Sequence, residues 1–414
     1  MKSLKISVVI LMSICFVFST ISSWAEVEIH PRLTVEEEYN DNIFLDSANE
    51  EEDWITTIQP GVNLSYQNRS VEASVDYSLR YRLYKNNDSE NLDDFKDVQQ
   101  ADANALFFRG RPFTLYLAEV ISRETIDERD DYAYSDAENR STVYRTTVTP
   151  EYRLQLMPTF SLLFGYTYSR ADYVDPRGDD TEEHEGRISL VKQLSASSEA
   201  FARYAYAIEM SDDNADEFDR QDYILGLTQQ LGGRTTLSLE GGYSQIDYDS
   251  GLDTDSTTWL VDIAYRLSQP VTFSLTYSQD FVVTAEDGLT ETKEARFGAA
   301  YVKESLTAST EIFWNNSDYI RLDREDTAYG VRFDFAKPLA RAVTVNFDAE
   351  YEYAQFDDLD VNEDVNRMTF GTSLDYEYRR FLASLGYRFR INESDIDDND
   401  YNNNIITLSV TVRF

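Results

Sequence analysis

The chain is poor in cysteine, histidine, glycine and proline. Its 414 residues include 1 Cys, 2 His, 16 Gly and 8 Pro. The single cysteine, Cys15, lies close to the N-terminus, so the long remainder of the chain can form neither disulfides nor cysteine-based metal sites. The low glycine and proline content excludes a collagen-like or low-complexity disordered polymer.

Basic residues are also scarce, because 37 Lys and Arg stand against 76 Asp and Glu, a formal net charge of −39. A chain this acidic is repelled by a phosphate backbone, so nucleic acid is not an expected partner. Aromatic side chains, in contrast, are abundant: they make up 14% of the residues, with 29 Tyr and 23 Phe. This composition indicates a structured, tyrosine-rich protein.

Residues 1–25 have the pattern of a secretory signal peptide. Two lysines precede the apolar stretch Ile6–Ile21, and Ser23–Ala25 provides a small-x-small cleavage site. An uncleaved membrane anchor is the alternative, but the apolar stretch is short and interrupted by polar residues. We therefore expect residues 1–25 to be removed and residues 26–414 to form a single domain.

After residue 25 the chain contains no run approaching the ~20 apolar residues of a membrane-spanning helix, which excludes an α-helical membrane protein. The dominant pattern is instead an alternation with a period of two. In Val71–Tyr84 the odd positions are apolar and the even positions are polar or charged, and Val343–Tyr353 and Phe381–Ile391 show the same pattern. Each such segment predicts a β-strand with one apolar and one charged face.

Two kinds of connection alternate between these strands. Nine short ones, such as Gln67–Arg69, carry turn residues, and ten longer ones, such as Asp172–Glu185, Asn315–Asp326 and Asn392–Asn404, are acidic. They predict about twenty antiparallel strands in sequence order, or eighteen if the first hairpin lies outside the wall. Open sheets rarely exceed ~10 strands, so a meander of this length should close. The predicted fold is an all-β, up-and-down barrel with short periplasmic turns and long acidic extracellular loops.

The apolar face of this barrel should point outward. A barrel of about 16 or more strands is too wide for side chains to fill, so its interior is wet and takes the charged face. An apolar outer wall of this extent requires lipid. The last strand, Ile406–Phe414, resembles the closing strand of bacterial outer-membrane barrels, in which a terminal aromatic residue is the assembly signal. The sequence therefore predicts a transmembrane barrel in the outer membrane of a Gram-negative bacterium, with Phe414 as the signal.

The even faces of the strands supply candidate lumen-lining residues. They are Asp76, Arg80, Arg82, Arg266, Arg332, Asp348, Glu350, Arg388 and Arg390. The pair Arg80 and Arg82 and the pair Arg388 and Arg390 lie near the loop ends of two strands that approach each other across the barrel closure. We hypothesise that these four arginines form a basic patch near the outer mouth that holds carboxylate or sulfate groups of a passing polymer. The alternative is that mixed charges simply pair and solvate a wide pore.

The beginning of the chain resembles a known family. The segment Tyr39–Leu45, an acidic gap and then Asp53–Gly61 are similar to the opening hairpin of outer-membrane barrels of the "beta-barrel porin 2" type. The specific similarity covers only about residues 35–66. It implies an association with exopolysaccharide biosynthesis and export systems, including those linked to PEP-CTERM protein sorting. Within the hairpin, Asn40–Asn42 suits a strand exit, and Pro60 predicts a bulge or weak pairing.

Catalytic and metal-binding patterns are not evident. His30 and His184 have no metal-ligand spacing, and His184 falls in the predicted acidic loop, where it should be solvated. The segments Asp357–Asp360 and Asp395–Asp400 could offer carboxylates to Ca²⁺, but they lack the glycine and closing glutamate of a calcium loop, so a solvated acidic surface is the default. The sequence predicts no enzyme activity, no cofactor and no resident metal.

Two functions remain open. The first is a porin-like channel for polar solutes or for exopolysaccharide export, in which the acidic outer loops would favour cations. The alternative is a non-conducting scaffold or receptor barrel with acidic surface loops. The expected partners are outer-membrane lipid and lipopolysaccharide, the barrel assembly machinery and, for an export role, polysaccharide export components.

Overall fold

The computed structural model describes residues 26–126, 135, 137, 139–174, 178–211, 217–251, 253–284, 288–322, 324–357, 362–396 and 399–414. The predicted signal peptide, residues 1–25 with Cys15, lies outside the described residues. In the described part the secondary structure consists of strands and one 3₁₀ turn, η1 (Asp88–Glu90). Within the same residues no helix is long and apolar enough to cross a bilayer.

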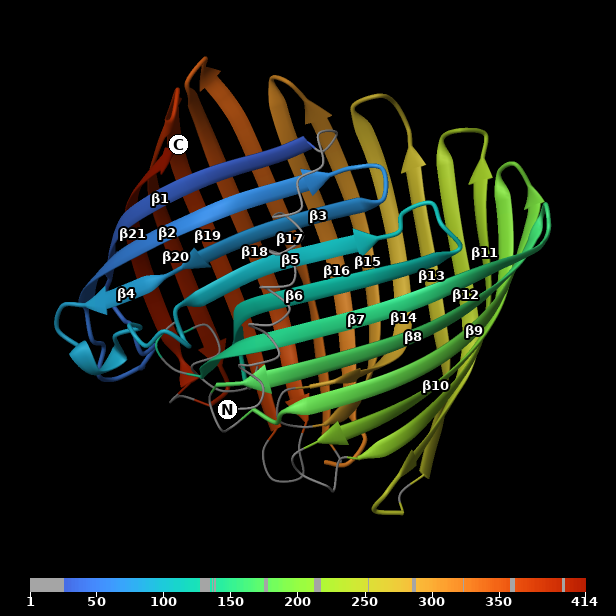
Figure 1. The fold of residues 1–414 in the computed structure, drawn as a ribbon. Helices are drawn as coiled ribbons and strands as arrows, with labels where there is room; N and C mark the ends of the chain where they lie inside the picture. Colours follow the sequence, from blue (N-terminus) through green and yellow to red (C-terminus); the bar gives the residue numbers. More distant parts are fainter. Residues whose placement is uncertain are drawn as a thin grey trace.

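The strands follow one another from end to end of the described chain (Figure 1). In order they are β1 (Glu26–Asn40), β2 (Asp53–Gln67), β3 (Val71–Leu79), β4 (Tyr81–Tyr84), β5 (Gln99–Phe107), β6 (Phe113–Thr125), β7 (Arg140–Met157), β8 (Phe160–Tyr173), β9 (Thr181–Ser195), β10 (Ser198–Ser211), β11 (Phe218–Leu231), β12 (Thr235–Tyr248), β13 (Asp253–Arg266), β14 (Val271–Val283), β15 (Leu289–Lys303), β16 (Leu306–Tyr319), β17 (Arg324–Ala340), β18 (Val343–Asp357), β19 (Asn362–Tyr378), β20 (Phe381–Ser394) and β21 (Tyr401–Arg413).

The wall strands pair antiparallel in chain order, and the two ends of the sheet meet. β1 pairs with β2 on one side and with β21 on the other, from Arg32↔Arg413 to Asn40↔Ile405. β3 and β4 both pair with β2 and are two parts of one wall strand, so the closed barrel has 20 strands. The predicted barrel of about twenty strands is confirmed. The alternative of eighteen is wrong, because the first hairpin forms part of the wall.

Pro60 explains why one wall strand is divided. β2 pairs with β3 up to Gly61↔Ser78 and with β4 from Ile58↔Tyr81, so Gln59 and Pro60 face the break. Proline has no N–H to donate to a ladder. On its other side β2 stays in unbroken register with β1, through Leu33↔Pro60. Of the two effects predicted for Pro60, the structure shows weakened pairing and no bulge.

The strands extend further into the acidic connections than their sequence predicts. β9 already begins at Thr181, β16 continues to Tyr319 and β21 begins at Tyr401, inside three stretches that we expected to be loops. The reason is that both faces of a strand are wet once it leaves the bilayer. Polar residues on both parities can then continue the ladder, and the period-two signal is lost although the strand is not.

The outer wall is apolar, as predicted. Large exposed hydrophobic side chains recur at every second residue, for example Ile29, Leu33 and Val35 on β1, and Ile406 and Leu408 on β21. Exposing this surface to water would cost roughly 25 cal/mol per Å². A closed barrel satisfies its own backbone hydrogen bonds, so the wall can lie in hydrocarbon. This barrel therefore belongs in the outer membrane of a Gram-negative cell.

Tyrosine hydroxyls mark the upper border of the apolar belt. Tyr39, Tyr206 and Tyr243 donate to carboxylates on the adjacent loop or strand at 2.6 to 2.7 Å, namely to Glu52, Asp219 and Asp255. A ring that is apolar on its body and polar at its tip is suited to the boundary between lipid and water. These contacts place the three tyrosines at the end of the barrel from which the long connections extend.

Candidate functional site

The candidate site is the inner face of the wall. All nine residues selected from the sequence lie on this inward-facing parity: Asp76, Arg80, Arg82, Arg266, Arg332, Asp348, Glu350, Arg388 and Arg390. They alternate with outward side chains such as Tyr265 and Leu267, both of which are exposed. Strand geometry accounts for this placement, because successive side chains point to opposite faces.

Ion pairs between inward side chains join adjacent strands and strands separated by one other strand. Arg32 binds the Asp76 carboxylate through both terminal nitrogens at 2.6 and 2.8 Å, and Arg332 contacts Glu350 at 2.6 Å and Glu311 at 3.6 Å. Other pairs include Arg203 with Glu240, Arg187 with Glu151, and Arg367 with Glu352. Because the lumen is wet, each exposed pair contributes only about 0 to 1 kcal/mol. Their main effect is to order the wall and to cancel charge locally.

One part of the wall gathers arginines that lie far apart in the sequence. Arg80, Arg388 and Arg390 line a single cavity of about 310 Å³. Three acids, Glu36, Glu38 and Asp348, line the same cavity, which we call the seam pocket because it lies beside the β1–β21 closure. Among the described residues, neither Arg80 nor Arg388 forms an ion pair. Their guanidinium groups are therefore available to a solute.

Glycine creates the space for part of this pocket. A Cβ at Gly371 would overlap the Asp348 carboxylate, which lies across the β18–β19 ladder from it.

The acidic residues Glu36 and Glu38 were not selected from the sequence. Their alternation with the outward Val35 could have assigned them to the inner face. Their proximity to Arg80, however, depends on barrel closure.

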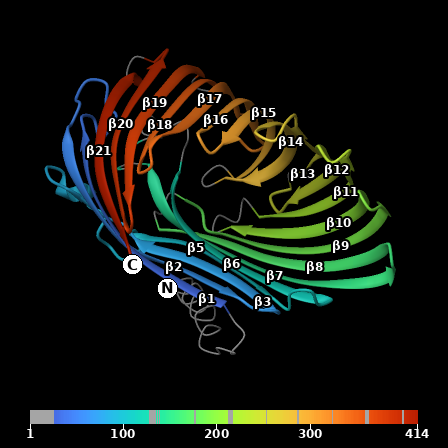
Figure 2. The same cartoon turned by 90° about the horizontal axis from the view of Figure 1, so that it is seen from above.

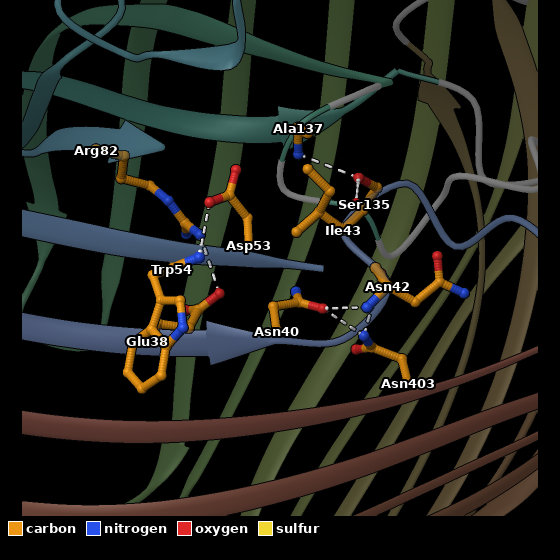
Figure 3. A network of polar contacts seen from close by, with 10 residues as sticks. All are labelled: Glu38, Asn40, Asn42, Ile43, Asp53, Trp54, Arg82, Ser135, Ala137 and Asn403. Atoms are coloured by element: carbon orange, nitrogen blue, oxygen red, sulfur yellow. Dashed lines mark hydrogen bonds and ion pairs between the residues drawn. The ribbon is translucent and has the colours of Figure 1, made fainter. Parts of the chain in front are cut away.

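Arg82 does not belong to the exposed patch that we predicted. Its side chain is only 2% exposed and donates to Glu38 Oε1 at 3.3 Å (Figure 3). The chain after β4 folds back, so that Arg82 and Leu92 exchange backbone hydrogen bonds. The guanidinium lies 5.7 Å from the ring centroid of Tyr84, which packs with Ile43 and Ile55. Alternation placed Arg82 on the correct face but could not show that its side chain is buried. The patch that a solute can reach therefore has three arginines.

Asparagines close the barrel above this pocket. Asn403 Nδ2 donates to Asn40 Oδ1 at 2.6 Å and to the Asn42 carbonyl at 3.1 Å (Figure 3). Asp41 accepts from the backbone N–H of Asn404 at 2.6 Å and from its Nδ2 at 2.7 Å. The segment Asn40–Asn42, part of the family-like opening hairpin, is thus a contact between the first and last strands. We call these five residues the seam latch.

Two aspartates order the connections next to the latch. Asp53 is fully buried and accepts from the backbone N–H groups of Trp54, Lys85 and Asn87 at 2.7 to 3.1 Å. In the β1–β2 connection, the backbone N–H groups of Asn49 and Ala48 donate to Asp46 and hold the pKa of its carboxyl below the ordinary value. Both carboxylates serve as backbone caps, which leaves them little capacity for a ligand.

The histidine and calcium expectations have different outcomes. His184 is not in a loop: it lies in β9, 2.6 Å from the Tyr166 hydroxyl and with its ring 5.2 Å from that of Tyr168. The partner strand β8 supplies these aromatic contacts, which the sequence alone could not assign. Parts of Asp357–Asp360 and Asp395–Asp400 lie outside the described residues. Within the described residues no group of three or more His, Cys, Asp or Glu side chains is arranged to hold a metal ion.

Comparisons with known proteins support the architecture. No family profile matches this sequence, and no curated protein matches it. Among solved structures, a ferric enterobactin receptor mutant from Pseudomonas aeruginosa superposes with a TM-score of 0.52 at 10% identity, covering 95% of this chain and 81% of the receptor. The FrpB iron transporter from Neisseria meningitidis gives a TM-score of 0.51 at 9% identity, covering 93% and 81%.

Similarity at this level of identity concerns the fold alone. It agrees with the closed antiparallel wall described above. The narrower resemblance to the porin 2 type and its link to polymer export stay predictions. The chain has the fold of the Gram-negative outer-membrane β-barrels.

Proposed function

We propose that this barrel is a channel for polar solutes, and that an anionic exopolysaccharide is the cargo it suits best. The observation that carries the proposal is the seam pocket, where Arg80 and Arg388 face the lumen without an ion-pair partner among the described residues. Guanidinium groups bind carboxylate and sulfate through paired hydrogen bonds. The resemblance of the opening hairpin to exopolysaccharide-associated porins points to the same cargo.

The acids of the seam pocket set the strength of this interaction. Glu36, Glu38 and Asp348 lie beside the arginines, so the pocket has nearly balanced charge. A passing anionic group would be attracted by the arginines and repelled by these acids, so it would not be held tightly. A conducting site needs such weak, exchangeable binding, because a cargo must leave as readily as it enters.

The first experiment is single-channel recording of the refolded protein in planar bilayers, with reversal potentials measured across a salt gradient. The test variant is Arg80→Glu with Arg388→Glu. The matched control is Arg153→Glu with Arg266→Glu, which also reverses two exposed arginines on the inner face, but at the short-turn end of β7 and β13. We expect the test variant to lose more anion permeability, and more polymer release in cells, than the control. Equal effects of the two variants would contradict the cargo proposal.

A second candidate is a non-conducting receptor or scaffold. Two solved structures of similar fold are described as a receptor and an iron transporter. Here Ser135, between β6 and β7, donates from its Oγ to the carbonyl of Ile43, between β1 and β2, at 2.8 Å. Bilayer recordings separate the two functions. A barrel that is folded by the criterion of heat-modifiable gel mobility and remains silent would favour the receptor, and the search would then turn to a ligand for its outer loops.

The proposal includes the partners that such a barrel requires. They are outer-membrane lipid and lipopolysaccharide around the apolar belt, the assembly machinery that inserts the barrel and, for export, components that deliver the polymer from the periplasm. No catalytic step and no nucleic acid enter the proposed function.

A further inference from the structure

The hairpin of β14 and β15 leaves the barrel wall at its loop end. β14 pairs with β13 only as far as Trp259↔Gln279, although β13 continues to Asp253. Its ladder with β15 continues to Val283↔Leu289. The tip of the hairpin is therefore an intact two-stranded unit that has separated from its neighbour on one side. Seen from above, the strands around β14 lean into the ring (Figure 2).

Apolar contacts anchor this tip inside the lumen. Phe281 and Leu289, only 6% and 1% exposed, pack with Phe218 of β11 and with Ile246 and Tyr248 of β12. Those three wall residues lie on the inward parity, opposite one another in the ladder or beside it. A buried apolar cluster is unusual in a wet barrel. Here it fixes the position of the hairpin.

The tip also reaches wall strands that are remote from it along the sheet. Phe281, Val282 and Val283 line a cavity of about 390 Å³ together with Arg145 of β7 and Ser169 of β8. Glu183 of β9, Glu209 of β10 and Arg220 of β11 also line this cavity, so the tip extends over the inner face of the wall toward β7 and β8. Charge contributes as well, because Asp280 is among the acidic groups that act on Arg220, another residue of the cavity.

We propose that the β14–β15 tip is the constriction of the lumen and that Val282 sets its size limit. Strand alternation turns Val282 away from the apolar cluster, and its side chain is 51% exposed. Solutes then pass between an apolar surface at Val282 and charged or hydroxyl groups at Arg145, Ser169 and Glu183. This lining suits a sugar ring, which has an apolar C–H face and a polar rim. The inference rests on the proposed channel function and identifies its specificity-determining residue.

Conductance tests the size limit. Val282→Trp should lower single-channel conductance and the size cut-off for neutral polymers by about twofold or more, and Val282→Gly should raise both, because a constriction dominates pore resistance. The matched control is Ser274→Trp, at an exposed inward position further down the same strand, where conductance should change little. A conducting barrel in which the Val282 and Ser274 variants behave alike would overturn the inference and leave the channel function standing.

A cross-link tests the geometry without relying on conduction. The described chain contains no cysteine, so Val282→Cys with Ser169→Cys introduces only two thiols there. A short bis-maleimide should join them within one chain and change the gel mobility of the folded barrel. The control pair is Val282→Cys with Ser309→Cys, also inward but outside this cavity, and it should not be joined. Equal cross-linking of both pairs, or of neither, would overturn the placement of the tip, whereas silence of the wild-type barrel in recordings would contradict the proposed function alone.

Discussion

Removal of the Asn403 side chain should weaken the closure of the barrel. Its Nδ2 donates to Asn40 Oδ1 at 2.6 Å, to the Asn42 carbonyl at 3.1 Å and to Asp41 Oδ1 at 3.4 Å, and the residue is fully buried. A neutral hydrogen bond contributes about 1 kcal/mol net, and an acceptor left buried without a partner costs about 1 to 3 kcal/mol. Water that enters the cavity would recover part of this loss. We therefore expect Asn403→Ala to lower the free energy of unfolding by about 2 to 4 kcal/mol.

The assay is equilibrium unfolding in denaturant, followed by heat-modifiable gel mobility and by tryptophan fluorescence. The denaturant midpoint should fall while the slope m stays unchanged, because the folded and unfolded surfaces are nearly the same. Asn402→Ala is the matched control: this side chain is one residue away, exposed, and makes no side-chain bond to the latch, so a change within about 0.5 kcal/mol is expected. If both variants unfold at the same midpoint, the seam latch does not stabilise closure and the reasoning fails.

Other changes probe the remaining features. Gly371→Ala should shift the Asp348 carboxylate and destabilise the barrel by about 1 kcal/mol in unfolding experiments, whereas Gly186→Ala, where a Cβ meets open space, should be neutral; equal effects would refute the steric account. Deletion of Phe414, which is 62% exposed and donates its N–H to the Pro31 carbonyl at 2.9 Å, should reduce membrane assembly in cells more than Val410→Ala, and unchanged surface levels would contradict its role as a signal. Reversal potentials of the wild-type barrel should show cation preference because the outer connections are acidic, and anion preference would overturn this expectation.

Sequence periodicity predicted the orientation of side chains in the wall correctly, but it predicted the strand ends near the long connections poorly. The alternation in Val71–Tyr84 predicted which side chains face inward, and Pro60 predicted the interruption opposite it. The same reasoning made strands such as β9 and β16 too short at their loop ends, because polar residues occupy both faces above the lipid. The alternation arises because one face of a strand contacts lipid and the other contacts water. It disappears where both faces contact water.

The candidate site was predictable only in part for a related reason. Arg80, Arg388 and Arg390 could be assigned to the lumen from parity and to one region from strand order. Arg82 satisfied the same criteria, but its side chain is buried beside Glu38 and Tyr84. Nothing in the local sequence of Phe281–Val283 distinguishes it from any other strand end, although it leaves the wall and lies over the inner face of other strands.

The sequence by itself determined the fold class, the strand order and the two faces of the wall, because side chains alternate along a strand and that alternation is a local property. Only the tertiary structure decided which residues meet. Asn40 and Asn403 are 363 residues apart in sequence and share a hydrogen bond, since closure brings the first and last strands together. The inward turn of β14 and β15 likewise depends on Phe218 and Tyr248 from other strands. These contacts arise from packing between distant segments, and no periodicity within a single segment encodes them.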